Sequence, residues 1–126
     1  MTYKNILLID DDEDDRELFL SAVSELSSDV ACTAMSSAKD ALEKLKSGEI
    51  APELIFLDLN MPVMNGQQFL AAVKQEPGLS RLPVVIFSTS SNTDIVYQTR
   101  DLGSQGFITK PHSFKQMKEV IGDWIL

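Results

Sequence analysis

Apolar and polar residues form two kinds of block that alternate along the chain. Short continuous apolar runs are typical of buried strands, and longer segments with apolar residues at helical spacing are typical of helices that cover a core. The runs predicted as strands are residues 6–9, 30–35, 54–57, 84–87 and 107–108. The pattern therefore predicts five strand–helix units in succession.

The helical segments each follow one of these runs. The first has its apolar positions at Leu18, Phe19, Ala22, Val23 and Leu26. A second helix is expected from Ala38 to the residue before Gly48, and a third carries Phe69, Leu70 and Val73 and ends before Pro77. The last two are expected over residues 92–102 and from 114 to the end of the chain. Gly48 and Gly103 stand where the second and fourth helices should stop, as glycine commonly does after a helix.

Strands that are apolar without alternation are covered on both faces, which is typical of parallel sheets. When strand–helix units are joined by right-handed crossovers, their helices cover both faces of the sheet, and the fold is called doubly wound. The expected fold class is therefore α/β, with a doubly wound parallel sheet of five strands. Ligands of such sheets bind at the carboxyl ends of the strands, so the residues that follow each run carry the functional argument.

Polar residues gather at these strand ends. Residues 10–12 are three aspartates after the first strand, and Asp58 follows the third. Ser88 ends the fourth strand, and Lys110 follows the fifth. Clustered carboxylates require a cation or raised pKa values, and Mg²⁺ prefers oxygen ligands. Carboxylates, a metal, a hydroxyl and an ammonium around one pocket are the groups used in phosphoryl transfer.

Composition narrows the class of protein. A chain of 126 residues is expected to form a single domain, residues 1–126, with no second module. The one cysteine, Cys32, excludes an intramolecular disulfide and fits a reducing compartment. Without an apolar stretch of about 20 residues or a signal-peptide pattern, a cytoplasmic location is expected.

Negative charge is concentrated near the N-terminus. The net charge is −8, and residues 10–17, DDDEDDRE, contain seven acids and one arginine. Such a chain is not expected to bind nucleic acid or an anionic membrane, because both require a basic face. Glu13, Asp14 and Asp15 are interpreted as acids of a helix start, where they complement the helix dipole.

Four segments carry a family resemblance: LLIDDDEDDR, LIFLDLNMPVMNG, PVVIFSTS and GSQGFITKP, at residues 7–16, 54–66, 83–90 and 103–111. Together they resemble the receiver domain of two-component response regulators, from Asn5 to the C-terminus. The resemblance implies a flavodoxin-like sheet with strand order 2-1-3-4-5. It also implies a single receiver domain that acts without an output domain.

The resemblance implies a role for each strand-end residue. Asp58 would accept the phosphoryl group, and Ser88 and Lys110 would contact it. Mg²⁺ would be bound by Asp11 directly, by Asp10 more distantly, by Asp58, and by the backbone carbonyl of Asn60.

The same resemblance implies the partners. The phosphoryl group would come from a phosphohistidine of a sensor histidine kinase or a phosphotransfer protein. The protein would then bind a downstream target or pass the group on, without turnover of a separate substrate. The fourth helix, fifth strand and fifth helix, including Tyr97 and Trp124, would form the partner or homodimer face.

Three positions depart from the usual family pattern. Ser88 stands where threonine is more common, and Thr89 is bulkier than the usual small residue, which is expected to narrow access to the site. Phe107 stands at the aromatic switch position, where tyrosine would carry a hydroxyl. A ring without that polar group should already favour burial before phosphorylation. We therefore expect Ser88 and Phe107 to form a switch that is partly in its active arrangement even in the unphosphorylated protein.

Other classes of protein fit less well. An EF-hand starting at Asp10 would need glycine and glutamate where Asp15 and Ser21 stand. A phosphatase of the haloacid-dehalogenase type would use Asp10 as the nucleophile and would leave Asp58 and Lys110 without a role. The third alternative is a degenerate receiver that serves only as an interaction scaffold.

Overall fold

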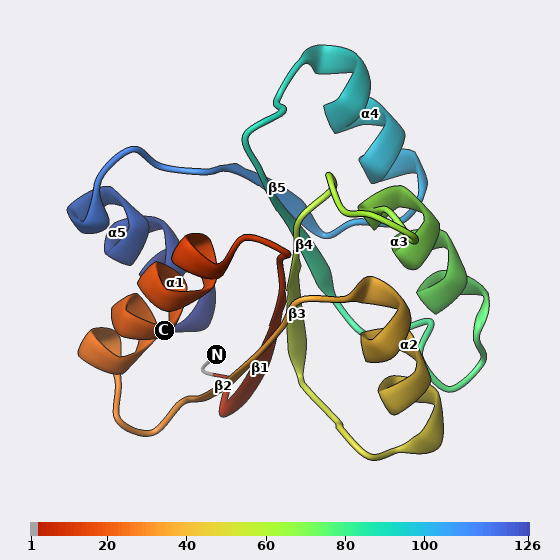
Figure 1. Ribbon diagram of the computed structural model, residues 1–126, viewed down its shortest axis with the longest axis horizontal. Coiled ribbons are helices and arrows are strands. Elements are labelled where there is room, and N and C mark those ends of the chain that lie inside the picture. The colour runs from red at the N-terminus through yellow and green to blue at the C-terminus, as the bar shows by residue number, and fades with distance from the viewer. Residues whose placement is uncertain (1–2) are drawn as a thin grey trace.

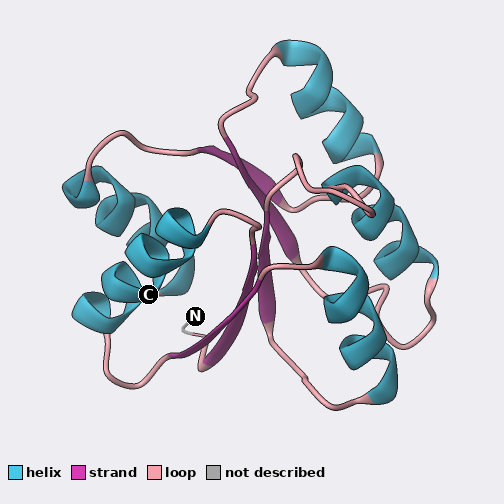
Figure 2. Ribbon diagram, viewed as in Figure 1, coloured by secondary structure: helices cyan, strands magenta, loops and turns pink. Residues whose placement is uncertain are grey.

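The computed structural model describes residues 3–126 and contains a parallel five-stranded sheet flanked by helices on both faces (Figures 1 and 2). The strand order is β2-β1-β3-β4-β5, which confirms the predicted fold class and order. The elements are β1 Asn5–Ile9, α1 Glu13–Leu26, β2 Ala31–Met35, α2 Ala38–Ser47, β3 Leu54–Leu57, α3 Gly66–Gln75, β4 Val84–Ser88, α4 Thr93–Asp101, β5 Gly106–Thr109 and α5 Phe114–Ile125.

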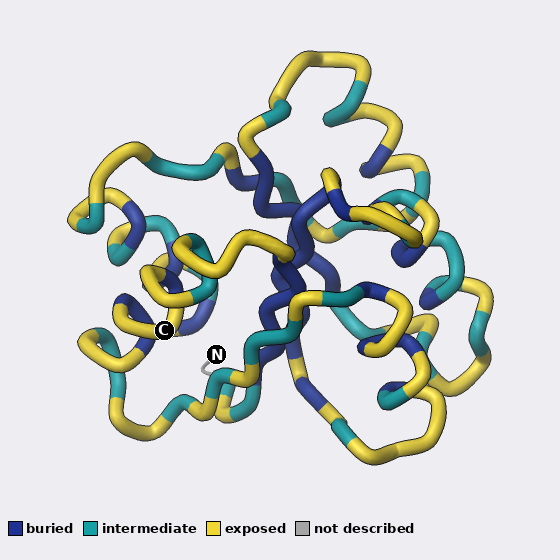
Figure 3. The backbone as a smooth tube through the Cα atoms, viewed as in Figure 1, coloured by how far each residue is buried: buried dark blue, intermediate teal, exposed yellow. Residues whose placement is uncertain are grey.

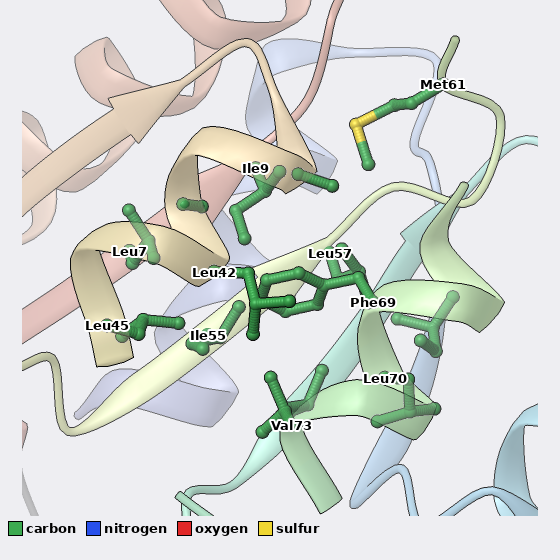
Figure 4. Packing of buried hydrophobic residues seen from close by; sticks show 14 of the residues in the cluster. Leu7, Ile9, Leu42, Leu45, Ile55, Leu57, Met61, Phe69, Leu70 and Val73 are labelled. Atoms are coloured by element: carbon green, nitrogen blue, oxygen red, sulfur yellow. The ribbon is translucent and has the colours of Figure 1, made fainter. Parts of the chain in front are cut away.

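The helices divide between the two faces of the sheet, with α1 and α5 on one face and α2, α3 and α4 on the other (Figure 1). Each face has its own core, because successive strand residues point in opposite directions. Ile6 and Leu8 pack into the core beneath α1 and α5, whereas Leu7 and Ile9 pack into the other. Figure 4 shows this second core, where Phe69 of α3 meets strand residues.

Phe19 anchors α1 to the sheet. Its ring centroid lies 5.0 Å from that of Phe56 and 5.5 Å from that of Phe87, in edge-to-face geometry. Leu18, one position earlier, is 45% exposed, so it does not belong to the buried face on which the apolar spacing had placed it. A residue adjacent in sequence is rotated by about 100° around the helix, so burial of Phe19 turns Leu18 outward.

The central strands are buried and the periphery is exposed (Figure 3). All residues of β3 and β4 are buried, whereas β2, at the edge of the sheet, is only partly covered. None of the helices within residues 3–126 has the length and apolar character needed to cross a membrane.

Candidate functional site

Strand register brings the predicted site residues to one edge of the sheet. Ile9 of β1 pairs with Leu57 of β3, so Asp10 and Asp58 follow neighbouring strands at the same level. The Asp58 backbone N–H donates to the Ile9 carbonyl at 2.9 Å, which keeps the two chains together beyond the strands. Carboxylate oxygens of Asp10, Asp11 and Asp58 lie within 4.8 Å of one another.

Asp10 is fully buried, and its position is set by the start of α1. Its Oδ1 accepts a hydrogen bond from the backbone N–H of Asp12 at 3.0 Å. Asp12 in turn caps α1, because its side chain accepts a hydrogen bond from the Asp15 backbone N–H. Arg16 donates to the Asp10 carbonyl oxygen at 3.0 Å. The turn between β1 and α1 is thereby held by its own acids.

Asp58 is buried, and its two carboxylate oxygens differ in their surroundings. Oδ1 accepts a hydrogen bond from the backbone N–H of Leu59 at 2.9 Å, and Oδ2 lies 3.6 Å from Lys110 Nζ. Gly66, the first residue of α3, packs closely behind this turn: a Cβ there would lie 2.5 Å from the Asp58 carbonyl oxygen. Glycine at this position therefore allows α3 to start directly against the Asp58 segment.

The pKa of Asp58 is raised to about 6, chiefly by burial and also by the nearby carboxylates of Asp10 and Asp11, against the opposing effect of Lys110. Burial likewise raises the pKa of Asp10, although Lys110 opposes this change. The carboxylates of the pocket thus carry more negative charge than the single ammonium of Lys110 can neutralise. It is a site at which a cation or a proton stabilises the folded protein.

A hard divalent cation fits the donors present. Asp10 Oδ2 is buried and receives no hydrogen bond of acceptable geometry from any group of residues 3–126. Together with oxygens of Asp11 and Asp58 it forms a set of carboxylate ligands, which suits Mg²⁺ or a similar ion. Asp11 is exposed, so the cluster is open to solvent on that side.

Lys110 is the cation of the pocket. Its Nζ lies 2.7 Å from Asp15 Oδ2, 2.9 Å from Asp10 Oδ2 and 3.6 Å from Asp58 Oδ2, and its side chain is only 10% exposed. Burial alone would lower its pKa, but the contacts with Asp15 and Asp10 outweigh burial, so the pKa is raised and the ammonium stays charged. The backbone N–H of Lys110 donates to the Ser88 carbonyl at 2.9 Å, which aligns the ends of β4 and β5.

Asp15 is the site residue that the sequence did not reveal. It lies in the first turn of α1, as expected for a helix-start acid, but its carboxylate also binds Lys110 across 95 positions of sequence. The available signal was only its place in the first turn of α1, close in sequence to Asp10 and Asp11. That place does not reveal which lysine reaches the helix.

Ser88 and Asn60 lie on the other side of the pocket. Ser88 is fully buried at the end of β4, and its Oγ accepts a hydrogen bond from the Ser90 backbone N–H at 3.1 Å. The Asn60 side chain donates to Ser90 Oγ at 3.3 Å, which links the loop after β3 to the loop after β4. Thr89, between the two serines, is exposed.

Phe107 lies on β5, half-buried, and packs against the core on the α2–α4 face of the sheet. It lines a shallow groove of about 290 Å³ between α4 and β5, together with Val96 and Arg100. Trp124 of α5 packs over Gly106 so closely that a Cβ there would lie 2.5 Å from the ring. Tyr97 of α4 is 58% exposed near the same groove.

The sheet has the doubly wound strand order of flavodoxin-like α/β proteins, and an acidic pocket lies at its carboxyl edge. The model of the response regulator receiver domain family matches residues 6–122. The chain belongs to this family, as the sequence motifs predicted.

Individual relatives agree with this assignment. Response regulator Rcp1 of Synechocystis is 32% identical over 123 residues, which cover 94% of this chain and 84% of Rcp1. The crystal structure of the phosphorylated cyanobacterial phytochrome response regulator RcpA has a TM-score of 0.88 at 30% identity, over 97% of this chain and 91% of RcpA. The structure of Mn²⁺-bound Rcp1 has a TM-score of 0.87 at 31% identity, over 97% and 94% of the two chains.

Proposed function

We propose that this receiver domain accepts a phosphoryl group on Asp58 from a phosphohistidine of a sensor kinase or a phosphotransfer protein. A carboxylate oxygen of Asp58 attacks phosphorus, the P–N bond to the imidazole breaks, and the imidazole leaves with that electron pair. Hydrolysis later returns the carboxylate and inorganic phosphate. The observation that carries the proposal is the asymmetry of Asp58: Oδ1 is held by a backbone N–H, and Oδ2 faces the ammonium of Lys110.

The chain's other groups are placed to assist this transfer. Lys110 can offer charge-assisted hydrogen bonds to phosphoryl oxygens, and Ser88 can donate its hydroxyl proton after a small movement. Ser88 ends β4, which pairs with β3, and Lys110 follows β5, which pairs with β4. In the strand register both residues lie just beyond the level of Asp58. The raised pKa of Asp58 means that, in the absence of a metal, the nucleophile is half ionised at about pH 6 and largely ionised only above about pH 7.

Mg²⁺ is the proposed cofactor, bound by Asp10, Asp11, Asp58 and the backbone carbonyl of Asn60. When bound, the ion neutralises the carboxylates and offsets charge on the transferred oxygens. Asp10 Oδ2, which accepts no hydrogen bond within residues 3–126, and the solvent-exposed Asp11 support this donor set. A Mn²⁺-bound form of the relative Rcp1 is consistent with a divalent ion at such a site.

The Asp58→Asn variant is expected to lose labelling by acetyl phosphate, because the amide cannot act as the nucleophile. Incorporation is measured by intact-mass spectrometry in the presence of Mg²⁺. Asp14→Asn is the matched control, since Asp14 is exposed in the first turn of α1, and it should label like wild type. Labelling of Asp58→Asn at the wild-type level would contradict the proposal.

The phosphatase alternative, with Asp10 as nucleophile, has less support. Asp10 is fully buried, one of its oxygens is occupied by the Asp12 N–H, and Lys110 lies 2.9 Å from the other. Lys110 Nζ lies farther from Asp58 Oδ2, at 3.6 Å, so this oxygen is less closely held. The scaffold alternative has less support because Asp10, Asp11, Asp58 and Lys110, which an active receiver would need, lie close together.

We further propose that the protein acts in the cytoplasm as a stand-alone receiver, through protein–protein contacts and without turnover of a separate substrate. The similarity to response regulator Rcp1, of which this chain covers 84%, supports a function as a receiver. The face formed by α4, β5 and α5 is the proposed partner or homodimer surface, and the groove beside Phe107 is part of it.

Phe107→Tyr is expected to increase the phosphorylation dependence of association through this face, by about threefold. Burying an aromatic ring contributes about 2 kcal/mol, and a tyrosine hydroxyl favours the outward, hydrated position that phosphorylation must reverse. Self-association is measured by sedimentation with and without beryllium trifluoride, a phosphoryl mimic, for wild type, Phe107→Tyr and Phe107→Ala. An identical response in all three would remove Phe107 from the mechanism.

A further inference from the structure

The hydrogen bond of the Lys110 ammonium is directed at α1. Its Nζ donates to Asp15 Oδ2 at 2.7 Å, the shortest of its three carboxylate contacts. The contact with Asp10 Oδ2, at 2.9 Å, lacks hydrogen-bond geometry, and Asp58 Oδ2 is 3.6 Å away. The Lys110 ammonium is thus shared between the carboxylates next to the proposed acceptor, Asp58, and the Asp15 carboxylate of α1.

The two ends of this ion pair are held in place by the backbone. The Asp15 N–H donates to the capping carboxylate of Asp12 at 3.0 Å, which fixes the first turn of α1. The Lys110 N–H donates to the Ser88 carbonyl at 2.9 Å, which fixes the end of β5. With both backbones anchored, the side chains of Asp15 and Lys110 meet without rearrangement of either element.

We propose that Asp15 is a positioning residue for Lys110 and sets how strongly the pocket holds a phosphoryl group. A group on Asp58 adds oxygens that must attract the ammonium in competition with the Asp15 carboxylate. Asp15 therefore weakens the hold of Lys110 on the phosphoryl group and favours the unphosphorylated arrangement. This inference rests on the proposed role of Asp58 as the acceptor.

The neighbouring Asp14 distinguishes this role from a general effect of negative charge. Both acids lie in the first turn of α1, and conversion of either to asparagine removes one charge near the same helix end. Asp14 is exposed, and its carboxylate makes no ion pair within residues 3–126, whereas the Asp15 side chain is 29% exposed and contacts Lys110. A difference between the two variants therefore reports the contact with Lys110.

The test measures the affinity of beryllium trifluoride in saturating Mg²⁺ by titration calorimetry. Asp15→Asn is expected to bind the mimic about fivefold more tightly than wild type, because a freed charge-assisted hydrogen bond becomes available to it. Asp14→Asn should stay within about twofold of wild type. In a Lys110→Gln background, Asp15→Asn should have no larger effect than Asp14→Asn, since the competing ammonium is gone.

The outcomes separate this inference from the function on which it rests. Thermal unfolding of each variant first establishes that it is folded at the temperature of the titration. If wild type does not bind the mimic, or binds it equally well after Asp58→Asn, the proposed phosphoacceptor is wrong. If wild type binds it but Asp15→Asn matches Asp14→Asn or binds more weakly, the positioning role of Asp15 is overturned. An Asp15→Asn gain that persists in Lys110→Gln also overturns it, because the effect would then not act through Lys110.

Discussion

Lys110→Met is expected to lower the free energy of unfolding by about 3 kcal/mol near neutral pH in the absence of divalent cations. The ammonium lies within 4 Å of carboxylates of Asp10, Asp15 and Asp58, and its side chain is nearly buried. Methionine fills a similar volume but leaves buried carboxylates without a counter-charge, which is the costly way to break a buried ion pair. Urea unfolding of both proteins in EDTA measures the difference.

The loss should shrink on acidification, because Asp10 and Asp58 take up protons more readily without their ammonium. Lys118→Met is the control: Lys118 pairs with Glu25 at 3.3 Å, and both side chains are substantially exposed. Exposed pairs of this kind contribute about 0–1 kcal/mol. If Lys110→Met and Lys118→Met lowered the free energy of unfolding equally, the buried contacts of Lys110 would not stabilise the protein more than an exposed ion pair does.

Asp58→Asn is expected to have the opposite effect and to stabilise the metal-free protein by about 2 kcal/mol at about pH 7.5. The pKa of Asp58 is raised by burial from 3.8 to about 6 in the folded protein. The folded state therefore holds the proton more tightly than the unfolded state, so stability falls as the pH rises from about 4 to about 6, and the full cost is present above that range. Asparagine avoids this cost and can still accept the Leu59 N–H.

The sign of this effect defines its pH window. The advantage of Asp58→Asn should be absent below about pH 3, where the carboxyl is protonated in both the folded and the unfolded protein, and complete above about pH 7. Unfolding curves at several pH values, with Asp14→Asn as the control for loss of one charge, measure it. A difference that is independent of pH, or a variant less stable than wild type at neutral pH, would contradict the raised pKa.

Much of the fold was predictable because its strands are continuous apolar runs. Buried strands such as β3 and β4 need no polar face, and this pattern points directly to a covered parallel sheet. The orientation of single helix positions was less predictable. Leu18 and Phe19 are both apolar, and only packing against Phe56 and Phe87 decides which of them is buried.

The candidate site was predictable where residues follow strands, because parallel strand ends meet at one edge. Asp10, Asp58 and Lys110 were placed together for this reason, and their distances agree. Asp15 was not, because its contact depends on how the first turn of α1 faces the loop after β5. A run of acids shows where charge accumulates, but not which carboxylate reaches a lysine 95 positions away.

The most direct test of the account is to locate the phosphoryl group. The protein is labelled with acetyl phosphate and Mg²⁺, and the acyl phosphate is reduced with borohydride, which converts the modified aspartate to homoserine. Tandem mass spectrometry of the peptides then identifies the position. The account predicts homoserine at position 58 alone; homoserine at position 10, or none in protein shown to be folded and Mg²⁺-bound, would contradict it.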